Sequence, residues 1–203
     1  MKLYFSAASP FVRKCLVCAH ELGMRGQIEL VPAAPHPVNR DHALVAQNPL
    51  GKIPTLLTAQ GDVLYDSRVI CEYLNDAARG TMLPAPGPAR WRVLVDQSLA
   101  DGIMDAAVLT RYETNMRPEN LRWDAWAAGQ LEKVSSGLAE IEKRAASLEG
   151  RIDLGVIAIA CALGYLDLRY ATLAWRETHP RIAAWFARFN QRESMTATQT
   201  SPT

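Results

Sequence analysis

Three short pairs of residues in the first third of the chain have the types and positions that bind anions or extended backbone. Ser9-Pro10 directly precedes an apolar helical repeat that starts at Phe11. Ser at the N-cap and Pro in the first turn are the preferred residues at a helix start. A capping Ser accepts a backbone N–H, so its own O–H can donate to an anion at the positive end of the helix. The alternative is an ordinary capping serine.

The other two pairs are Ile53-Pro54 and Asp66-Ser67. A Pro that enters a strand can follow a cis peptide, which would turn the preceding backbone toward a ligand, or it is an ordinary strand-entry proline. Ser67 stands where a helix begins, so its hydroxyl and backbone N–H would point at an anion, or it is another helix cap. None of these pairs is specific alone, whereas their order along the chain is.

Cys15 and Cys18 form a C-x-x-C pair that suggests redox chemistry or metal binding. A redox pair works at a helix start, where the helix dipole lowers the thiol pKa, and Ser9 and Pro10 occupy that place. No second C-x-x-C or pair of histidines completes a zinc site. We therefore expect buried structural thiols, no metal, and the reducing compartment that suits four cysteines without a disulfide spacing.

The charge balance narrows the possible partners. The chain has 203 residues, with 22 Lys and Arg against 21 Asp and Glu, for a formal net charge of +1. Nucleic acids and anionic membranes bind proteins that carry a surplus of positive charge, and this chain has almost none. The longest apolar run, residues 154–166, is too short for a bilayer, and the chain starts without a signal-peptide pattern. We expect a cytoplasmic protein with no nucleic-acid or membrane partner.

Residues 1–79 alternate short apolar runs with helical patterns, which predicts an α/β domain. In chain order the expected elements are strand 2–6, helix 11–22, strand 28–31, helix 41–48, strands 55–58 and 63–65, and helix 66–74. The sites named above therefore lie where strands pass into helices, or where the chain enters a strand.

Residues 80–88 hold three prolines and two glycines, which predicts a linker. Beyond it the periodicity predicts an all-helical domain over 89–203. Its expected helices are 89–116, 120–148, 154–168 and 180–192, and Trp91 and Trp123 are expected in their core. Helix 154–168 is apolar on nearly all sides and should lie at the centre, whereas the polar tail 196–203 should be disordered. Asp153 is expected to cap the central helix, although Val156 cannot complete a reciprocal capping box.

Taken together, these segments resemble the cytosolic glutathione S-transferase family, and most closely its bacterial members with a Ser-Pro at the first helix. The resemblance covers nearly the whole chain. It is carried by Ser9-Pro10-Phe11-Val12-Arg13-Lys14, Asn48-Pro49-Leu50-Gly51-Lys52-Ile53-Pro54-Thr55-Leu56, Tyr65-Asp66-Ser67-Arg68-Val69-Ile70-Cys71-Glu72-Tyr73-Leu74 and the helix 157–169. It implies a thioredoxin-like N-terminal domain, a helical C-terminal domain and a homodimer.

The resemblance also implies roles for residues that contact glutathione, the co-substrate. Ser9 would donate a hydrogen bond to the glutathione sulfur, with Phe11 in the same site. Ile53 would pair its backbone with that of the cysteinyl residue, ahead of a cis Pro54. Ser9 rather than Tyr4 or Cys15 is expected nearest the sulfur, because Ser9 caps the first helix and strand alternation would bury Tyr4.

The remaining parts of glutathione would be held by charged and polar side chains. Asp66 and Ser67 would hold the γ-glutamyl amine and carboxylate. Lys52 would reach the glycyl carboxylate, together with one of three residues: His36, Arg40 or His42.

The resemblance implies an enzyme that adds the glutathione thiolate to a small hydrophobic electrophile, as in detoxification. Arg111 and Tyr112 fall late in the first long helix and are candidates for the electrophile pocket or for a solvated surface. Asp101 would reach the partner subunit's glutathione amine, or is a solvated acid. One alternative is a glutathione-dependent peroxidase or thiol oxidoreductase, although the lack of a Cys at the helix start argues against reduction of disulfides. Another is a non-catalytic glutathione-binding protein.

Overall fold

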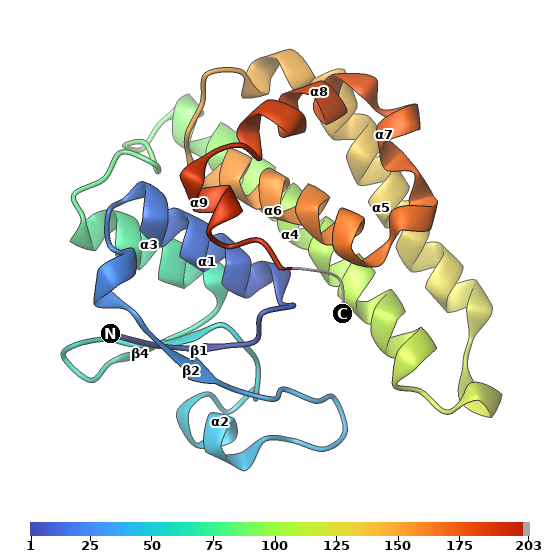
Figure 1. Cartoon of the computed structure of the whole chain (residues 1–203), viewed down its shortest axis with the longest axis horizontal. Coiled ribbons are helices and arrows are strands. Elements are labelled where there is room, and N and C mark those ends of the chain that lie inside the picture. The colour runs from blue at the N-terminus through green and yellow to red at the C-terminus, as the bar shows by residue number, and fades with distance from the viewer. Residues whose placement is uncertain (201–203) are drawn as a thin grey trace. The chain divides into compact units, whose positions relative to one another are not determined.

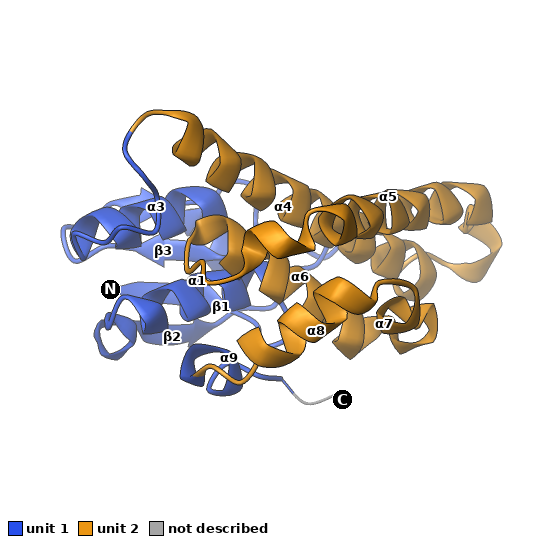
Figure 2. Cartoon of the chain, turned by 90° about the horizontal axis from the view of Figure 1, so that it is seen from above, with its two compact units in different colours: residues 1–85, 193–200 blue, residues 86–192, 201–203 orange. Residues whose placement is uncertain are grey.

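The computed structural model describes residues 1–200, which fall into two units (Figure 2). Unit 1 comprises residues 1–85 together with 193–200, and unit 2 comprises residues 86–192. Residues 193–200 therefore pack with the N-terminal part of the chain, although the sequence places them in the helical domain. The last three residues of the expected tail, 201–203, lie outside the described residues.

A four-stranded mixed sheet forms the base of unit 1. Its strand order is β2 (Glu29–Pro32), β1 (Lys2–Phe5), β3 (Thr55–Leu57) and β4 (Val63–Leu64). β1 runs parallel to β2 and antiparallel to β3, and β3 pairs antiparallel with β4. Leu3 lies opposite both Leu30 and Leu56, and the side chains of Leu3 and Leu56 are fully buried in the core.

Helices α1 (Pro10–Glu21) and α3 (Ser67–Ala77) cover one face of this sheet, and the short α2 (His42–Gln47) lies on the other side (Figure 1). A 3₁₀ turn, Arg25–Gln27, leads from α1 into β2. The strands and helices of unit 1 thus follow the order expected from the sequence, with bounds that shift by one to three residues. This arrangement positions the starts of α1 and α3 and the loop before β3.

The segment after residue 192 is ordered by contacts with α1. Helix α9 (Glu193–Thr196) packs on α1, where Arg13 Nη2 donates to the Met195 carbonyl at 3.1 Å. Ser194 Oγ donates to the Glu21 carboxylate, and Thr200 Oγ1 donates to the Ala7 carbonyl at 2.7 Å. The expectation of a disordered tail is therefore wrong for residues 196–200, which these contacts hold in place although only Thr196 of them lies in a helix.

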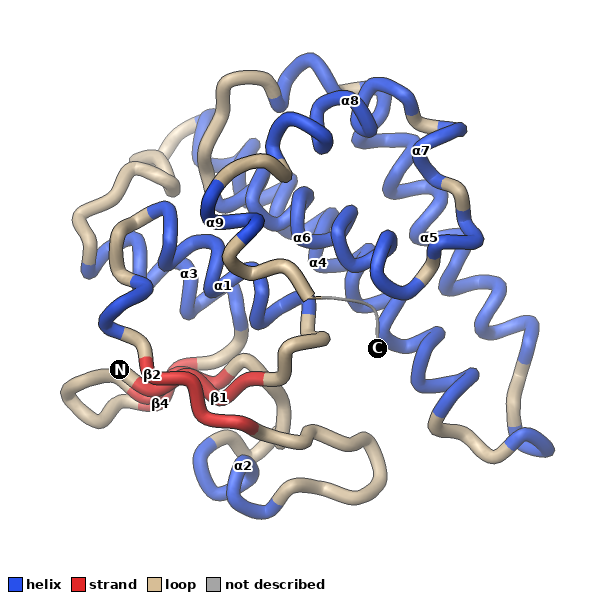
Figure 3. Tube along the Cα trace, in the orientation of Figure 1, coloured by secondary structure: helices blue, strands red, loops and turns tan. Residues whose placement is uncertain are grey.

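Among the described residues, every regular element of unit 2 is a helix or a 3₁₀ turn (Figure 3). Its elements are α4 (Pro88–Asn115), 3₁₀ turn Glu119–Leu121, α5 (Asp124–Lys143), 3₁₀ turn Ala145–Leu148, α6 (Leu154–Arg169), 3₁₀ turn Ala171–Leu173, α7 (Trp175–Thr178) and α8 (Pro180–Phe189). Every residue from 154 to 163 is buried, which confirms α6 as the central helix. Asp153 caps it as expected, accepting the Gly155 and Val156 N–H groups at 3.0 and 3.1 Å.

Two expectations for unit 2 are wrong. The helix expected over 120–148 is divided, because the buried Glu113 carboxylate accepts the Trp123 N–H at 2.7 Å and holds Trp123 in an extended conformation. The helix accordingly starts at Asp124. Trp91 and Trp123 are not in the core, since they are 63% and 65% exposed.

Among residues 1–200, no single helix is long and apolar enough to cross a membrane. One pair, Leu154–Arg169 with Ala171–Thr178, meets that criterion only when its two helices are counted together across a bend of 101°.

Candidate functional site

Ser9 is the N-cap of α1, as its position before Pro10 predicts. Its backbone is extended, with φ −80° and ψ 119°, and its Oγ accepts the Val12 N–H at 3.3 Å. The residue is partly exposed, and within residues 1–200 its O–H donates to no other group. A hydroxyl donor therefore remains available at the positive end of α1.

The loop before β3 is held by the buried side chains of Asn48 and Thr55. Asn48 Nδ2 donates to the Lys52 carbonyl at 3.1 Å and to Thr55 Oγ1 at 3.0 Å, and Thr55 Oγ1 donates to the same carbonyl at 2.8 Å. The Ile53–Pro54 peptide is cis, which confirms that prediction. In the described part of the chain, the Ile53 N–H and carbonyl form no hydrogen bond, so this short backbone segment can pair with a ligand.

Asp66 and Ser67 divide the roles at the start of α3. Asp66 is the N-cap, accepting the Arg68 N–H at 2.9 Å and pairing with Arg68 Nη2 at 3.0 Å. Burial opposes ionisation of Asp66, but these hydrogen bonds outweigh it and lower the pKa of its carboxyl. Ser67 is only 2% exposed, and its hydroxyl forms no hydrogen bond to any described residue. The Tyr65–Asp66 peptide is also cis.

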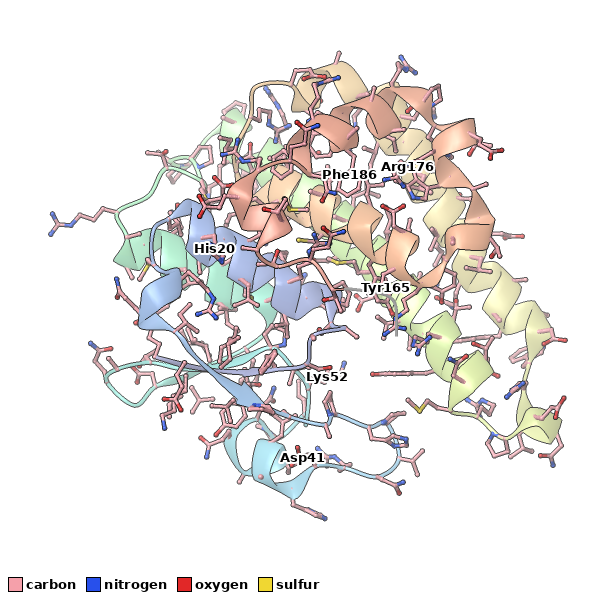
Figure 4. All side chains as sticks on the ribbon, viewed as in Figure 1. His20, Asp41, Lys52, Tyr165, Arg176 and Phe186 are labelled. Carbon is pink, nitrogen blue, oxygen red and sulfur yellow. The ribbon has the colours of Figure 1, made fainter. Side chains whose placement is uncertain are left out.

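The candidates for a glycyl carboxylate differ in how they are engaged. Lys52, on the loop before β3 (Figure 4), is exposed and has no acidic partner among residues 1–200. The Arg40 guanidinium donates to the Pro49 carbonyl. His36 Nδ1 accepts the N–H groups of Val38 and Asn39. His42 is exposed at the start of α2. Phe11 lies partly exposed in the first turn of α1.

The cysteines of unit 1 are buried, as the sequence predicts. Cys15, Cys18 and Cys71 lie between α1 and α3, with 3.9 Å between the sulfurs of Cys15 and Cys71. Burial raises the pKa of the Cys15 thiol well above its usual range. A protonated, buried thiol is a poor nucleophile. No group of three or more His, Cys, Asp or Glu within residues 1–200 is arranged to hold a metal ion.

Lys14 is a feature of unit 1 that the sequence analysis did not identify. Its side chain is 0% exposed, which is rare for lysine. It lies near three ionisable groups, since its positive charge acts to lower the pKa values of Cys15, Cys71 and Asp66. The available signal was its place on the buried face of α1, four residues after Pro10.

Unit 2 gathers tyrosines and arginines where α4 and α6 pack. Tyr170 Oη donates to the Ala107 carbonyl at 2.6 Å, and its ring meets that of Tyr165 edge to face at 6.5 Å. Arg111 and Tyr112 are both partly exposed on α4. Burial raises the pKa of Tyr112, and it raises that of Tyr165 to about 12, so both hydroxyls are protonated at neutral pH. No motif in the sequence marked Tyr165, Tyr170 or the neighbouring Arg169 as a site residue.

Asp101 is 5% exposed within unit 2, so the alternative of a solvated acid is wrong. The expected contact with the partner subunit's glutathione stays a prediction.

Comparison with known proteins decides the family. Two family models match the chain, "Glutathione S-transferase, N-terminal domain" over residues 8–77 and "Glutathione S-transferase, C-terminal domain" over residues 124–188. This chain belongs to the glutathione S-transferase family. Its four-stranded mixed sheet and its helical unit are the thioredoxin-like and helical parts that the family resemblance implies.

Three matches to this glutathione S-transferase family member extend over nearly the whole of both chains. The uncharacterised GST-like protein YibF of Escherichia coli K12 is 34% identical over 203 residues, covering 98% of each chain. A glutathione transferase family member from Pseudomonas fluorescens Pf-5, solved with bound glutathione, is 46% identical with a TM-score of 0.96, over 100% of this chain and 99% of that one. A second P. fluorescens Pf-5 structure, with bound S-(propanoic acid)-glutathione, is 44% identical with a TM-score of 0.91, over 100% of both chains.

Proposed function

We propose that this protein is a glutathione transferase in which the Ser9 hydroxyl stabilises the glutathione thiolate. The observation that carries the proposal is the Ser9 O–H at the start of α1, which caps the helix through its oxygen and donates to no other described group. A donor at a helix N-terminus favours an anion over its neutral form.

The energetics suit one such donor. A thiol of pKa ~8.5 is only ~3% ionised at pH 7, and a shift of roughly two units makes thiolate the major form. That shift corresponds to about 2.7 kcal/mol of preference for the anion. A charge-assisted hydrogen bond together with a helix terminus supplies an effect of this size.

Other polar groups of unit 1 would hold the rest of glutathione. The unpaired Ile53 backbone would pair with the cysteinyl backbone, and Asp66 and Ser67 would bind the γ-glutamyl end. Lys52 would attract the glycyl carboxylate. Bound glutathione in the 46% identical P. fluorescens protein supports this assignment.

For the second substrate we propose the part of unit 2 around Arg111 and Tyr112. The 44% identical P. fluorescens protein holds S-(propanoic acid)-glutathione, and by analogy this chain would accommodate a substituent on the glutathione sulfur. Cytoplasmic location and a role in detoxification are parts of the same proposal.

A homodimer is also part of the proposal. Trp91 and Val95 lie one turn apart on α4 and are 63% and 58% exposed, and Val69 on α3 is exposed as well. Exposed large apolar side chains favour a protein partner, and closed two-fold pairs are the commonest soluble assembly. In such a dimer Asp101 would reach the partner subunit's glutathione amine.

The test is the Ser9→Ala variant with Ser6→Ala, in the same loop, as its matched control. We expect Ser9→Ala to lose the ultraviolet absorbance of bound thiolate and conjugation of an aryl halide, while glutathione affinity is retained. Ser6→Ala should behave as wild type. Unchanged thiolate absorbance in Ser9→Ala would contradict the assigned role, and faster turnover of a peroxide than of the aryl halide would favour the peroxidase alternative.

A further inference from the structure

Two arginines of unit 2 differ from most of the others in having no acidic partner. Arginines of this unit that form ion pairs with Asp or Glu include Arg117, Arg144, Arg151, Arg176, Arg181 and Arg188. Arg111 and Arg169 form none with any described residue. Arg92 and Arg122 also lack an acidic partner, but they are exposed, so water solvates their charges.

Arg111 and Arg169 do not have that full solvation. Both residues are partly buried, and Arg169 Nε is buried with no hydrogen-bond partner in the described residues. Placing a charged donor away from water without a partner is costly, and such groups are normally paired. The two guanidinium groups are therefore positioned to receive an anion that is not part of this chain.

The packing of α4 on α6 brings the two arginines to the same region. Arg111 stands one turn after Ala107, whose carbonyl accepts the Tyr170 hydroxyl at 2.6 Å, and Arg169 immediately precedes Tyr170. Tyr165, labelled on α6 in Figure 4, lies edge to face with Tyr170.

Tyrosine side chains place neutral aromatic rings near the two arginines. Burial is the main influence on the pKa of Tyr165 and raises it, while the charges of both Arg111 and Arg169 act in the opposite direction. The charge of Arg111 acts in the same sense on Tyr112 and Tyr170. Both guanidinium groups are therefore within electrostatic reach of the Tyr165 ring, and the region combines two positive charges with flat aromatic surfaces.

We infer that Arg111 and Arg169 bind a carboxylate on the acceptor substrate, whose aromatic or unsaturated part lies against the partly exposed Tyr112. Guanidinium groups bind carboxylates through two parallel N–H donors, and aromatic rings favour stacked or edge contacts with planar groups. The inference rests on the transferase function proposed above and narrows its acceptor from a small hydrophobic electrophile to one that carries a carboxylate.

A purely structural role predicts a different outcome. Arg169 is the last residue of α6, where a cation interacts favourably with the carbonyl end of the helix. In that case its removal would change the stability of the fold and leave the choice of acceptor unaltered. Acceptor preference therefore separates the two roles.

The experiment compares a chlorodinitrobenzoate with its methyl ester, which removes the negative charge and adds one methyl group. With either one the glutathione thiolate forms a carbon–sulfur bond at the ring carbon that carries chlorine, and chloride leaves with the bonding electron pair. Relative to the uncatalysed rates, we expect wild-type kcat/KM to favour the acid. Arg111→Gln and Arg169→Gln should each lower kcat/KM for the acid about ten- to a hundredfold, mainly through KM, with little change for the ester.

Arg92→Gln, which removes an exposed arginine of the same helix α4, is the matched control and should alter neither acceptor. Equal losses for acid and ester in the Arg111 and Arg169 variants would overturn the inference, as would a wild-type preference for the ester.

A binding measurement separates failure of the inference from failure of the proposed function. Calorimetry with unreactive dinitrobenzoate and its methyl ester needs no turnover. Tighter binding of the acid, weakened by Arg111→Gln and Arg169→Gln, would support the anion site even if neither acceptor were conjugated. Equal affinities for acid and ester in the wild type would overturn it.

Discussion

Charged groups in unit 2 are mostly satisfied inside the chain, whereas several polar groups near the expected glutathione site of unit 1 are not. Asp96 in unit 2 is 1% exposed and accepts from Arg144 at 2.7 Å and from Arg151 at 2.9 Å. In unit 1 the Ser67 hydroxyl and the Ile53 backbone have no partner among residues 1–200. Internal ion pairs hold a fold together, and unpaired donors and acceptors are free to recognise a ligand.

The close approach of α6 to α4 explains why Asp96 depends on its arginines. A Cβ atom at Gly155 would lie 2.8 Å from both Asp96 Cβ and the Val93 carbonyl, so only glycine allows this packing. The carboxylate is shielded from water as a result, and its charge needs partners within the chain.

Asp96→Asn tests this comparison with the largest expected effect. It leaves two arginines beside a neutral amide, and breaking a buried ion pair costs about 3–5 kcal/mol of the free energy of unfolding. The control is Glu149→Gln, which breaks the exposed pair with Arg188 and should cost less than about 1 kcal/mol. Urea denaturation measures both, and equal losses would show that burial does not distinguish the two pairs.

Tyr165 gives unit 2 an alkaline sensitivity. Burial raises its pKa to about 12, whereas in the unfolded chain tyrosine ionises near ~10. Above pH ~10 the folded state thus keeps a proton that the unfolded state loses. The contribution of Tyr165 to the free energy of unfolding is therefore complete below pH ~10 and is lost as the pH rises through about 12. Its full size is about 2 to 3 kcal/mol.

Stability against urea, measured across this alkaline range, should therefore fall more steeply in the wild type than in Tyr165→Phe. Parallel pH profiles for the two proteins would show that Tyr165 ionises normally in the fold.

Ser67→Ala tests whether an unpaired polar group of unit 1 serves ligand binding rather than the stability of the fold. Because the hydroxyl has no partner within residues 1–200, its removal should leave stability almost unchanged. We expect glutathione affinity to fall about tenfold, the usual effect of losing one hydrogen bond to a charged group. Calorimetry and thermal unfolding on the same sample check both parts, and a loss of stability without a loss of affinity would assign Ser67 to the fold instead.

The sequence predicted those parts of the fold that depend on local signals. Ser9-Pro10 and Asp153 mark helix starts through capping, which involves only neighbouring residues. The division of helix 120–148 depends on Glu113, which reaches Trp123 from a preceding helix, and the order of residues 196–200 depends on contacts with α1. Such contacts leave no periodic signal in either segment.

The candidate site follows the same rule. Its residues in unit 1 lie at strand and helix ends that short motifs reveal, and the cis peptide at Pro54 agrees with its motif. Arg111 and Arg169 come together only through the packing of α4 on α6. The sequence therefore indicated Arg111 as a candidate site residue but gave no signal for Arg169. The buried Lys14 has an ordinary surface residue type and is recognised only by its face of α1.

A crystal structure with bound glutathione tests the central claim most directly. We expect the glutathione sulfur to lie within hydrogen-bond distance of Ser9 Oγ, with the cysteinyl backbone paired to Ile53. Cys15 is fully buried and should lie away from the sulfur. A sulfur placed beside Tyr4 or Cys15, and out of reach of Ser9, would contradict it.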